Sequence, residues 1–305
     1  MIEYIGKVSL DYSYYTGNDS YSDGFIEDEL LSIVKRHSEK DFDKVILESY
    51  NWALFYHLSI LRKNIIEWIP SNKKREVLEI GSGCGAITGA LADKYENITC
   101  IELSKKRSLI NAYRHKEKNN ISIFIGNFQD IYRNIHKKFD VITLIGVYEY
   151  AGAYIESNEP YLDFLKMTKE LLAPNGRILI AIENKFGLKY WAGCQEDHIG
   201  GYFSGVEGYP SDSQVKTFGK NELEKLFADA GLLIDYVAYP YPDYKFPVAI
   251  YTDLYLPKKG DLRNNQRNFD QARVELFDEG KVYDQLIEEG LFPIYSNSFF
   301  YSLKA

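Results

Sequence analysis

Short apolar runs alternate with amphipathic stretches through the middle of the chain. Runs rich in Ile, Val and Leu have the length and composition of buried strands and cover 77–80, 98–102, 121–125, 141–145 and 177–182. Between them, apolar residues recur at helical spacing over 86–94, 105–114 and 160–172. Strands and helices that alternate in this way predict an α/β fold, with a parallel sheet covered on both faces.

The two ends of the chain carry further elements. Apolar residues approximate a 3.6-residue period over 26–37 and 42–68, and these two helices predict an N-terminal helical cap. Near the other end, a helix is expected at 220–230. Two more strands are expected at 232–239 and 296–303, and we expect them to pair antiparallel because an unpaired edge strand is costly.

The clearest chemical signal is a glycine-rich turn at the end of the first core strand. Gly81, Gly83 and Gly85 follow the strand and open the next helix. Such a turn lets a ligand lie close to bare backbone at a helix N-terminus, as dinucleotides and S-adenosylmethionine both do. The glycines also satisfy the dinucleotide pattern G-x-G-x-x-G/A, so they do not decide between the two ligands.

Polar residues at the strand ends favour S-adenosylmethionine over a dinucleotide. Glu79 lies in the end of the first strand, where it would repel a pyrophosphate and attract a sulfonium or an ammonium group. Glu102 ends the second strand, placed to accept hydrogen bonds from both hydroxyls of a ribose. After the third strand, Asn127 and Phe128 offer an amide and a ring to an adenine.

With these residues the chain resembles the class I S-adenosylmethionine-dependent methyltransferases, over about 77–239 and the last strand. The resemblance implies S-adenosylmethionine as the cofactor and a seven-stranded Rossmann-like sheet. It also implies cofactor contacts from Leu103, next to the second-strand acid, and from Ile145 and Gly146 at the end of the fourth strand. Asn127 departs from the family, where an Asp is common at this position.

The resemblance also suggests how the chain is divided. The sheet of this family ends in an antiparallel hairpin, so 240–291 is expected to be an insertion between the last two strands. The expected segments are a cap at 1–70, a methyltransferase core at 71–239, the insertion, and a final strand at 292–305. The core includes the loop 185–215, which is long enough to be uncommon unless it is functional.

A narrower resemblance concerns the second half of the chain. The blocks 182–193, 196–198, 203–209, 239–245 and 296–299 are similar to methyltransferase domains that accompany bacterial glycosyltransferases in surface-polysaccharide synthesis. This resemblance implies a role in polysaccharide biosynthesis, a small-molecule or glycan acceptor, and a glycosyltransferase as a partner. It does not identify the acceptor.

A hydroxyl acceptor needs a base, and the chain offers two candidates. His198 lies in the loop after the fifth strand, and loops at strand carboxyl ends face the ligand crevice. Its neighbours Glu196 and Asp197 are candidates to orient the ring. Glu149, after the fourth strand, is the alternative base. Three of the remaining histidines are expected at the surface, namely His37, His115 and His136. His57 lies in the apolar helix and is expected to have a structural role.

Charge and composition exclude several partners. The 305 residues include 36 basic and 44 acidic ones, a net charge of −8, which disfavours nucleic acid. No apolar run approaches the ~20 residues that a membrane helix needs, so no membrane insertion is expected. No secretory signal is expected from the first residues and no CxxC pair occurs, so the expected location is the cytoplasm. No HxH, HExxH or clustered Asp ligand set occurs, so no metal is predicted.

One compositional feature stands out beyond these classes. The chain has 26 tyrosines, which cluster near 4–21, 148–161 and 236–255. Packing explains most of them, although tyrosine-rich loops also make good binding surfaces at low entropic cost.

The sequence therefore predicts a methyltransferase that O-methylates a sugar or glycan precursor. Two other functions stay open at this point. One is an NAD-dependent oxidoreductase, against which Glu79 counts. The other is a cofactor-binding module without catalysis that partners a glycosyltransferase.

Overall fold

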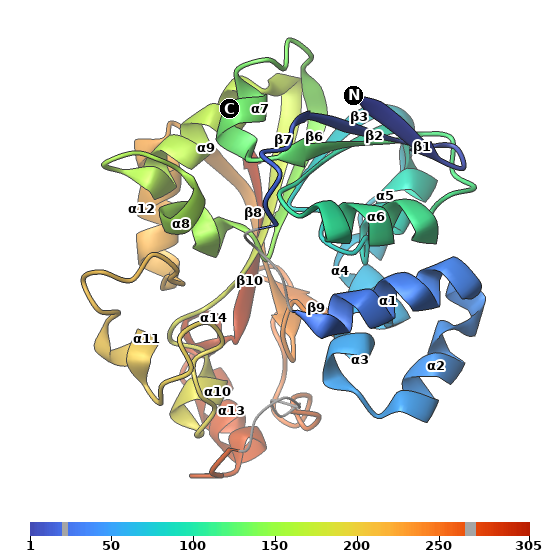
Figure 1. Ribbon diagram of the computed structural model, residues 1–305. Coiled ribbons are helices and arrows are strands. Elements are labelled where there is room, and N and C mark those ends of the chain that lie inside the picture. The colour runs from blue at the N-terminus through green and yellow to red at the C-terminus, as the bar shows by residue number, and fades with distance from the viewer. Residues whose placement is uncertain (20–23, 266–272) are drawn as a thin grey trace. The chain divides into compact units, whose positions relative to one another are not determined.

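The computed structural model describes residues 1–19, 24–265 and 273–305. The chain divides into two compact units (Figure 1). The first contains Met1–Leu144 and Leu171–Gly176, and the second contains Ile145–Glu170 and Arg177–Ala305.

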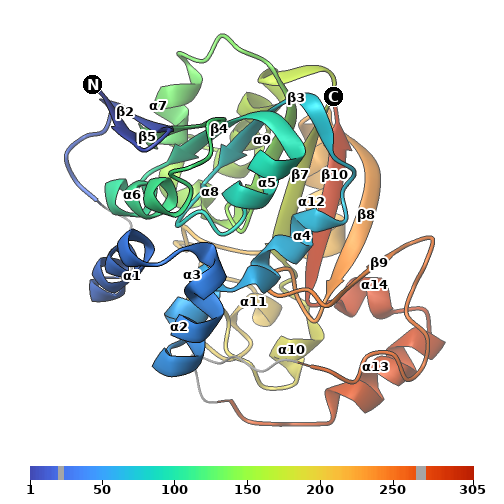
Figure 2. The ribbon, with the colours of Figure 1, turned by 90° about the vertical axis from the view of Figure 1, so that its right-hand side faces the viewer.

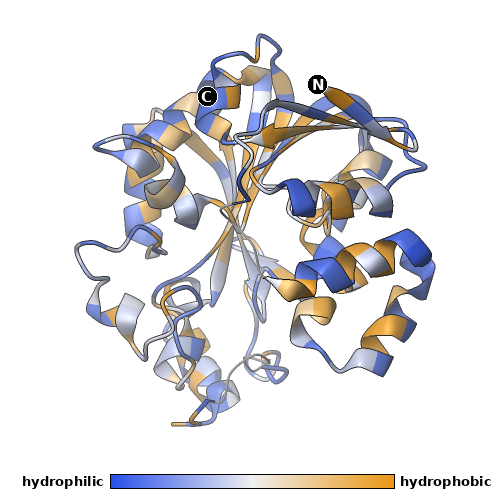
Figure 3. Ribbon diagram, viewed as in Figure 1, coloured by the Kyte–Doolittle hydropathy of each residue, from blue (hydrophilic) through white to orange (hydrophobic). Residues whose placement is uncertain are grey.

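The sheet of the first unit is parallel except at one edge. Its strands are β1 (Ile2–Ile5), β2 (Val8–Tyr14), β3 (Asn72–Ile80), β4 (Tyr95–Glu102), β5 (Ile121–Gly126) and β6 (Phe139–Ile145). Their order is β1-β2-β5-β4-β3-β6, and only the pair β1/β2 is antiparallel. The central strands are buried apolar runs, as expected where helices cover both faces (Figure 3).

Helices surround this sheet. They are α1 (Phe25–Arg36), α2 (Phe42–Ser49), α3 (Trp52–Leu58), α4 (Asn64–Glu67), α5 (Thr88–Lys94), α6 (Lys105–Arg114) and α7 (Phe128–Tyr132), with short 3₁₀ turns at Glu39–Asp41 and Ile60–Lys63. Leu30 and Val34 of α1 share a buried cluster with Ile110 of α6 and Leu54 of α3. The cap helices therefore pack on α6 and on Cys84 of the turn after β3 through a shared apolar core.

The long helix expected at 42–68 is broken, and the sequence contains the reason. Tyr50 adopts a left-handed conformation (φ 49°) that ends α2. Asn51 then caps α3, its side-chain oxygen accepting from the backbone N–H of Ala53 and Leu54. Ser59 caps the next turn in the same way, so capping chemistry overrides the apolar period.

The second unit is built on an antiparallel sheet. Its strands β7 (Leu172–Glu183, whose first residues belong to the first unit), β10 (Ser298–Lys304), β8 (Leu233–Tyr241) and β9 (Ala249–Thr252) pair in that order. Its other elements are a 3₁₀ turn at Tyr148–Tyr150, α8 (Ala151–Tyr154), α9 (Pro160–Glu170), α10 (Leu188–Trp191), α11 (Ser204–Glu207), α12 (Lys220–Asp229), α13 (Glu279–Glu288) and α14 (Phe292–Tyr295).

The expected pairing of the last two long strands is confirmed. β10 runs antiparallel to β8, with Tyr301 opposite Val237, and the two strands lie side by side in Figure 2. The expected count of seven strands is wrong, because the described residues form ten. The additional strands are β1, β2 and β9, and β1 and β9 have only four residues each, too few for an apolar pattern to mark them.

The expected segment boundaries stay predictions. The cap region 1–70 contains two strands before its helices, and β9, α13 and α14 lie between β8 and β10 in the sequence. Parts of the cap and of the insertion, 20–23 and 266–272, lie outside the described residues. Within the part of the chain that the structure describes, no helix combines the length and apolar character that crossing a membrane requires.

Candidate active site

The glycine turn after β3 has the backbone geometry that the sequence predicts. Gly81, Gly83 and Gly85 have φ angles of 70°, 52° and 78°, which only glycine adopts without strain. No described atom lies within 4 Å of the place that a Cβ on Gly83 would take. A ligand can therefore lie directly against this backbone. At Gly85, by contrast, a Cβ would meet Asn111 Oδ1 of α6 at 2.4 Å, so that glycine allows close packing.

Glu102 ends β4 as a buried carboxylate next to this turn. Its Oε2 accepts from the Gly83 N–H at 2.7 Å, and its Oε1 accepts from the Ser104 N–H at 2.9 Å. Burial raises the pKa of Glu102, although the Ser104 N–H and the Arg107 charge oppose this. The carboxylate is thus held in one orientation at the carboxyl edge of the sheet.

Glu79 has partners inside the unit. Its Oε2 accepts from the Thr88 hydroxyl at 2.6 Å and lies 3.4 Å from the Cys100 thiol. Burial raises the pKa of Glu79 to about 7, against the effect of these two hydrogen bonds. Glu79 therefore links β3 to α5 and β4. Its attraction for a cationic cofactor stays a prediction.

His115 is not at the surface, and that expectation is wrong. Its side chain packs under the glycine turn, with Nε2 3.0 Å from the Gly85 carbonyl oxygen. Burial and the neighbouring Arg114 lower the pKa of His115 to about 3, so it is neutral at physiological pH. A Cβ on Gly89 would lie 2.6 Å from its ring, and the histidine thus supports the first turn of α5.

The remaining expected cofactor contacts are also located. Asn127 caps α7, its side-chain oxygen accepting from the Gln129 N–H, and Phe128 is the first residue of that helix. Leu103 follows Glu102 directly. In the second unit, Gly146 follows Ile145 with a φ of 68°, and a Cβ there would lie 2.5 Å from the Tyr244 hydroxyl oxygen.

These features of the first unit fit an adenosyl group. Open space at Gly83 leaves backbone exposed to a ligand, and Glu102 presents a fixed carboxylate for ribose hydroxyls. Both lie at the carboxyl edge of a parallel sheet, the usual position of a nucleotide site in this kind of fold. The first-unit residues that would hold the cofactor are Gly81, Gly83, Gly85, Glu102, Leu103, Asn127 and Phe128.

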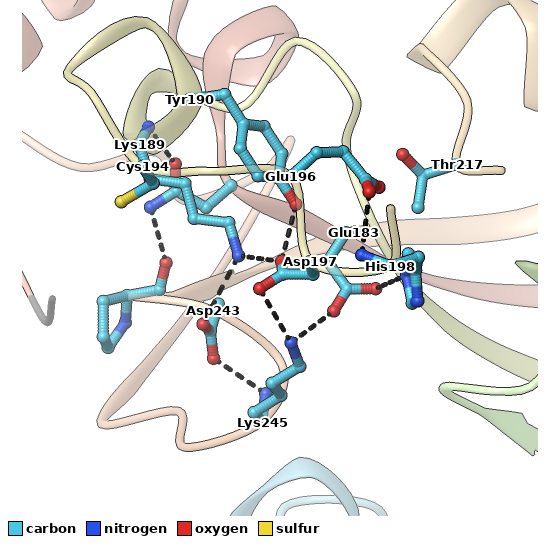
Figure 4. A network of polar contacts seen from close by, with 12 residues as sticks. Glu183, Lys189, Tyr190, Cys194, Glu196, Asp197, His198, Thr217, Asp243 and Lys245 are labelled. Atoms are coloured by element: carbon cyan, nitrogen blue, oxygen red, sulfur yellow. Dashed lines mark hydrogen bonds and ion pairs between the residues drawn. The ribbon is translucent and has the colours of Figure 1, made fainter. Parts of the chain in front are cut away.

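In the second unit, three ionisable side chains from different elements gather together. Glu149 lies in the 3₁₀ turn after β6, Glu183 ends β7, and His198 lies in the loop after α10. One ligand atom of each lies within 4.8 Å of the others. Glu183 Oε2 is 3.8 Å from His198 Nε2, an ion-pair distance rather than a hydrogen bond (Figure 4). Neither oxygen of the buried Glu149 carboxyl has a hydrogen-bond partner among the described residues.

Two lysines surround this group and bind Asp197. Lys189 Nζ lies 2.6 Å from Asp197 Oδ2, which also accepts from the Tyr190 hydroxyl at 2.6 Å. Lys245 Nζ bridges two carboxylates, at 2.7 Å from Glu183 Oε1 and 3.4 Å from Asp197 Oδ1 (Figure 4). The lysine charges keep the pKa of Asp197 well below its usual range, despite burial. Asp197 is therefore an anion that fixes the lysines.

The charges change the protonation of the cluster. Burial lowers the pKa of His198, but the carboxylates of Glu183, Glu149 and Glu196 outweigh it and raise the value to about 9. Burial and the charge of Glu183 raise the pKa of Glu149 to about 8. Burial alone would raise the pKa of Glu183, but the charges of Lys245 and His198 lower it below its ordinary value. At neutral pH the cluster therefore holds protons on His198 and Glu149.

The loop that carries His198 is held by backbone contacts. Glu196 Oε2 accepts from the N–H groups of His198 and Ile199 at 2.7 and 2.6 Å. Its Oε1 accepts from the Tyr209 hydroxyl, which also bonds Thr217. Glu196 thus fixes the backbone of this loop and Glu183 is the acid nearest the ring.

One asparagine joins the separate sequence blocks. Asn297, just before β10, accepts from the Lys189 N–H with its side-chain oxygen at 2.9 Å. Its amide nitrogen donates to the Pro242 carbonyl at 2.9 Å, and its backbone carbonyl accepts from the Asn184 N–H at 3.0 Å. The blocks around 184–189, 242 and 297 therefore form one structure around the cluster.

The spacing of Glu149, Glu183 and His198 would also suit a metal ion. However, the Lys245 ammonium group and the proton on His198 already supply positive charge at these carboxylates. A cation would have to displace both. The absence of a metal stays a prediction.

Comparison with known proteins identifies the domain that contains the glycine turn and Glu102. A family model described as a methyltransferase domain matches residues 78–178, from β3 into β7. The chain contains a methyltransferase domain. The protein is therefore an enzyme, and S-adenosylmethionine is its cofactor and methyl donor. No curated protein sequence matches the chain at a significant level.

One solved structure agrees with this chain in fold, and a second resembles it more distantly. A chain of the complex between the Haloferax volcanii Trm112 methyltransferase activator and a methyltransferase is 15% identical, with a TM-score of 0.50. The match covers 87% of this chain and 97% of that one. An S-adenosylmethionine-dependent methyltransferase from Clostridium acetobutylicum is 14% identical over 87% of this chain and 96% of its own, with a TM-score of 0.43. At these identities the likeness concerns the fold alone.

Sequence reasoning missed the residue that contacts His198 in the methyltransferase. Glu183 stands in a block that the sequence singled out, but its position before a loop gave no reason to choose it over Glu196 or Asp197. Its role depends on β7 ending where the loop returns, which is a long-range feature. Lys245 belongs to the block 239–245, and its partners Glu183 and Asp197 lie in other blocks of the sequence.

Proposed function

We propose that this methyltransferase O-methylates a sugar or a glycan precursor, and that the acceptor hydroxyl binds at Glu149, Glu183 and His198. The observation that carries the proposal is the buried pair of His198 and Glu183, with the unpaired Glu149 carboxyl beside it. Glu149 follows the end of β6 by four residues. In the class I family the end of this strand contacts the methionine part of the cofactor, and Glu149 belongs to the segment that follows it.

The chemistry of methyl transfer explains why such a cluster is useful. Bound S-adenosylmethionine supplies a methyl group on a sulfonium, which is already a good leaving group. The acceptor oxygen forms a bond to the methyl carbon, the sulfur–methyl bond breaks, and the hydroxyl proton must go to a base. In our proposal the unprotonated His198 ring, which is the minor form at neutral pH, takes that proton, and Glu183 stabilises the charged ring that results. Asp197 keeps Lys189 and Lys245 in place around them.

The first-unit residues have complementary roles in this proposal. Glu102 binds the ribose hydroxyls, the glycine turn contacts the cofactor through its backbone, and Asn127 with Phe128 contacts the adenine. Ile145 and Gly146 contact the methionine part, and Glu79 favours the cationic end. These roles follow from the family resemblance and from the positions of the residues at the strand ends.

The narrower resemblance supports a glycan acceptor and a glycosyltransferase partner in the cytoplasm. The sequence alone left a non-catalytic module with the same partner as an alternative, because such a module would keep the residues that bind the cofactor. It would not need a buried His–Glu pair beside an unpaired carboxyl, since that arrangement is costly without a ligand.

Methyl-labelled S-adenosylmethionine and a panel of acceptors test this proposal. The panel contains nucleotide sugars and oligosaccharides, with amino sugars and free amines as the contrasting class. We expect label on hydroxyl oxygen, located by mass spectrometry, and no label on the amines. Transfer only to nitrogen would overturn the hydroxyl assignment, and cofactor binding without transfer to any acceptor would favour the non-catalytic module.

A stability measurement tests the description of the cluster independently of the acceptor. Because the folded pKa of Glu149 is about 8, the folded state retains a proton that the unfolded chain releases above its ordinary value near 4.5. The wild type therefore loses stability as the pH rises from about 4.5 to about 8, and Glu149→Gln removes this loss. We expect Glu149→Gln to match the wild type near pH 5 and to exceed it by on the order of 1–3 kcal/mol at pH 8.

Urea unfolding at the two pH values measures this difference. Glu207→Gln, at an exposed position in α11, is the matched control and should show no pH-dependent difference from the wild type. A variant Glu149→Gln that is less stable than the wild type at pH 8 would contradict a protonated, unpaired Glu149.

A further inference from the structure

The first unit contains a strand, β2, that the sequence did not predict and that lies second from the edge of the sheet. β2 runs parallel to β5 and lies beside it, with Ser9 opposite Ser122 and Tyr14 opposite Gly126 (Figure 2). Parallel neighbours end at the same edge of a sheet. The end of β2 therefore lies at the edge where β5 leads into Asn127 and β4 ends in Glu102.

The contact between these strand ends is close. Gly126 has a φ of 150°, and a Cβ there would lie 2.6 Å from the Tyr14 carbonyl oxygen and 2.8 Å from the Tyr14 Cβ. Only glycine permits this approach. Tyr14 thus lies directly against the residue that precedes Asn127 and Phe128, the residues expected to contact adenine.

The same segment is attached five residues later to α6. Asp19 Oδ1 accepts from the Lys105 N–H at 2.6 Å, and its Oδ2 accepts from the Lys106 N–H at 3.1 Å. These N–H groups belong to the first turn of α6, where a helix favours negative charge. Lys105 is three residues after Glu102, so this attachment adjoins the residue expected to bind ribose.

Aromatic side chains gather where this stretch begins. The rings of Tyr12 and Tyr15 meet edge to face at 6.3 Å, and Lys105 Nζ lies 5.6 and 5.9 Å from their centres. Burial and the Asp19 carboxylate raise the pKa of the Tyr15 hydroxyl. Tyr14 and Tyr15 are both half-buried.

We propose that residues 14–19 form a wall of the adenosine subsite and that Asp19 is the positioning residue that holds this wall. The segment runs from the end of β5 to the first turn of α6, and these two points flank the positions expected for adenine and ribose. Its tyrosine rings suit a flat aromatic base. The inference rests on the cofactor assignment, and it concerns only residues of the first unit.

Calorimetry with three ligands tests the wall. S-adenosylhomocysteine, 5′-methylthioadenosine and adenosine share the adenosine part and differ in the rest. Asp19→Ala should raise the Kd for each by a similar factor, roughly 5- to 30-fold, because only the shared part touches the wall. Asp19→Asn, which retains one acceptor oxygen, should recover part of this loss. In turnover with S-adenosylmethionine, KM should rise while kcat stays close to that of the wild type.

The matched control is Asp28→Ala. Asp28 Oδ1 lies 2.8 Å from Lys106 Nζ, so this variant removes the same charge beside the same turn of α6 without releasing the segment. It should leave all three Kd values within about twofold of the wild type. An equal loss in Asp28→Ala and Asp19→Ala would overturn the inference, because net charge would then explain both.

Hydrogen exchange on the wild type keeps the inference testable if Asp19→Ala folds poorly. S-adenosylhomocysteine should slow amide exchange at 14–19 as it does at 81–85. Protection of 81–85 with none at 14–19 would overturn the wall and leave the methyltransferase assignment intact. No binding of S-adenosylhomocysteine to the wild type would overturn the cofactor assignment and this inference with it.

Discussion

Replacing His198 with alanine should lower the rate of methyl transfer by roughly 100- to 10,000-fold, the loss typical of a missing general base. The Kd for S-adenosylhomocysteine should stay close to that of the wild type, because the proposed cofactor contacts lie on other residues. Steady-state kinetics with the acceptor found in the panel, together with calorimetry, measures both quantities. His136→Ala, at an exposed position, is the matched control and should change neither.

The rate of methyl transfer should also depend on pH in a defined direction. A base with a pKa of about 9 is unprotonated in roughly one molecule in a hundred at pH 7, so the rate should rise with pH and level off above about 9. His198→Ala should abolish this rise. Glu149→Gln should move it to lower pH, because the Glu149 carboxyl is one of the groups that raise the pKa of His198.

The alternative base is tested by the same pair of variants. A large rate loss in Glu149→Gln, with His198→Ala within a few-fold of the wild type, would assign the proton transfer to Glu149. Loss of cofactor binding in His198→Ala would instead contradict a role confined to the acceptor.

The second large effect concerns Glu102. Glu102→Ala should weaken binding of S-adenosylhomocysteine by more than about 100-fold, because two charge-assisted hydrogen bonds to ribose, each worth roughly 1.5–3 kcal/mol, would be lost. The substitution also frees the N–H groups of Gly83 and Ser104, which loosens the glycine turn. Glu96→Ala, on the exposed side of the same strand, should bind like the wild type. Equal affinity in both variants would contradict the ribose assignment.

The sequence predicts the parts of this protein that depend on local patterns. The core strands are continuous apolar runs and the glycine turn is a contiguous motif, so both could be located without coordinates. Tyr50 and Asn51 show the limit of periodicity, because their capping conformations break an apparently continuous helix. In the strand Val8–Tyr14 apolar and polar residues alternate, unlike the continuous apolar runs of the buried central strands, so it carries a different pattern from the strands that were predicted.

In the candidate active site, too, local sequence patterns locate some residues, whereas long-range contacts determine the others. His198 and Glu149 could be chosen because they follow strands, where chemistry concentrates in an α/β fold. Glu183 and Lys245 could not be matched to them, since their contacts arise only when β7, the loop after α10 and the turn after β8 come together. The pKa of His198 depends on these contacts as well, so the sequence alone gave no reason to expect an alkaline base.

Titration of the wild type with S-adenosylhomocysteine and, separately, with NAD tests the central claim most directly. If the glycine turn and Glu102 hold S-adenosylmethionine, calorimetry will show saturable one-to-one binding of S-adenosylhomocysteine and no heat of binding with NAD. Tight binding of NAD, with no response to S-adenosylhomocysteine or S-adenosylmethionine, would contradict the account.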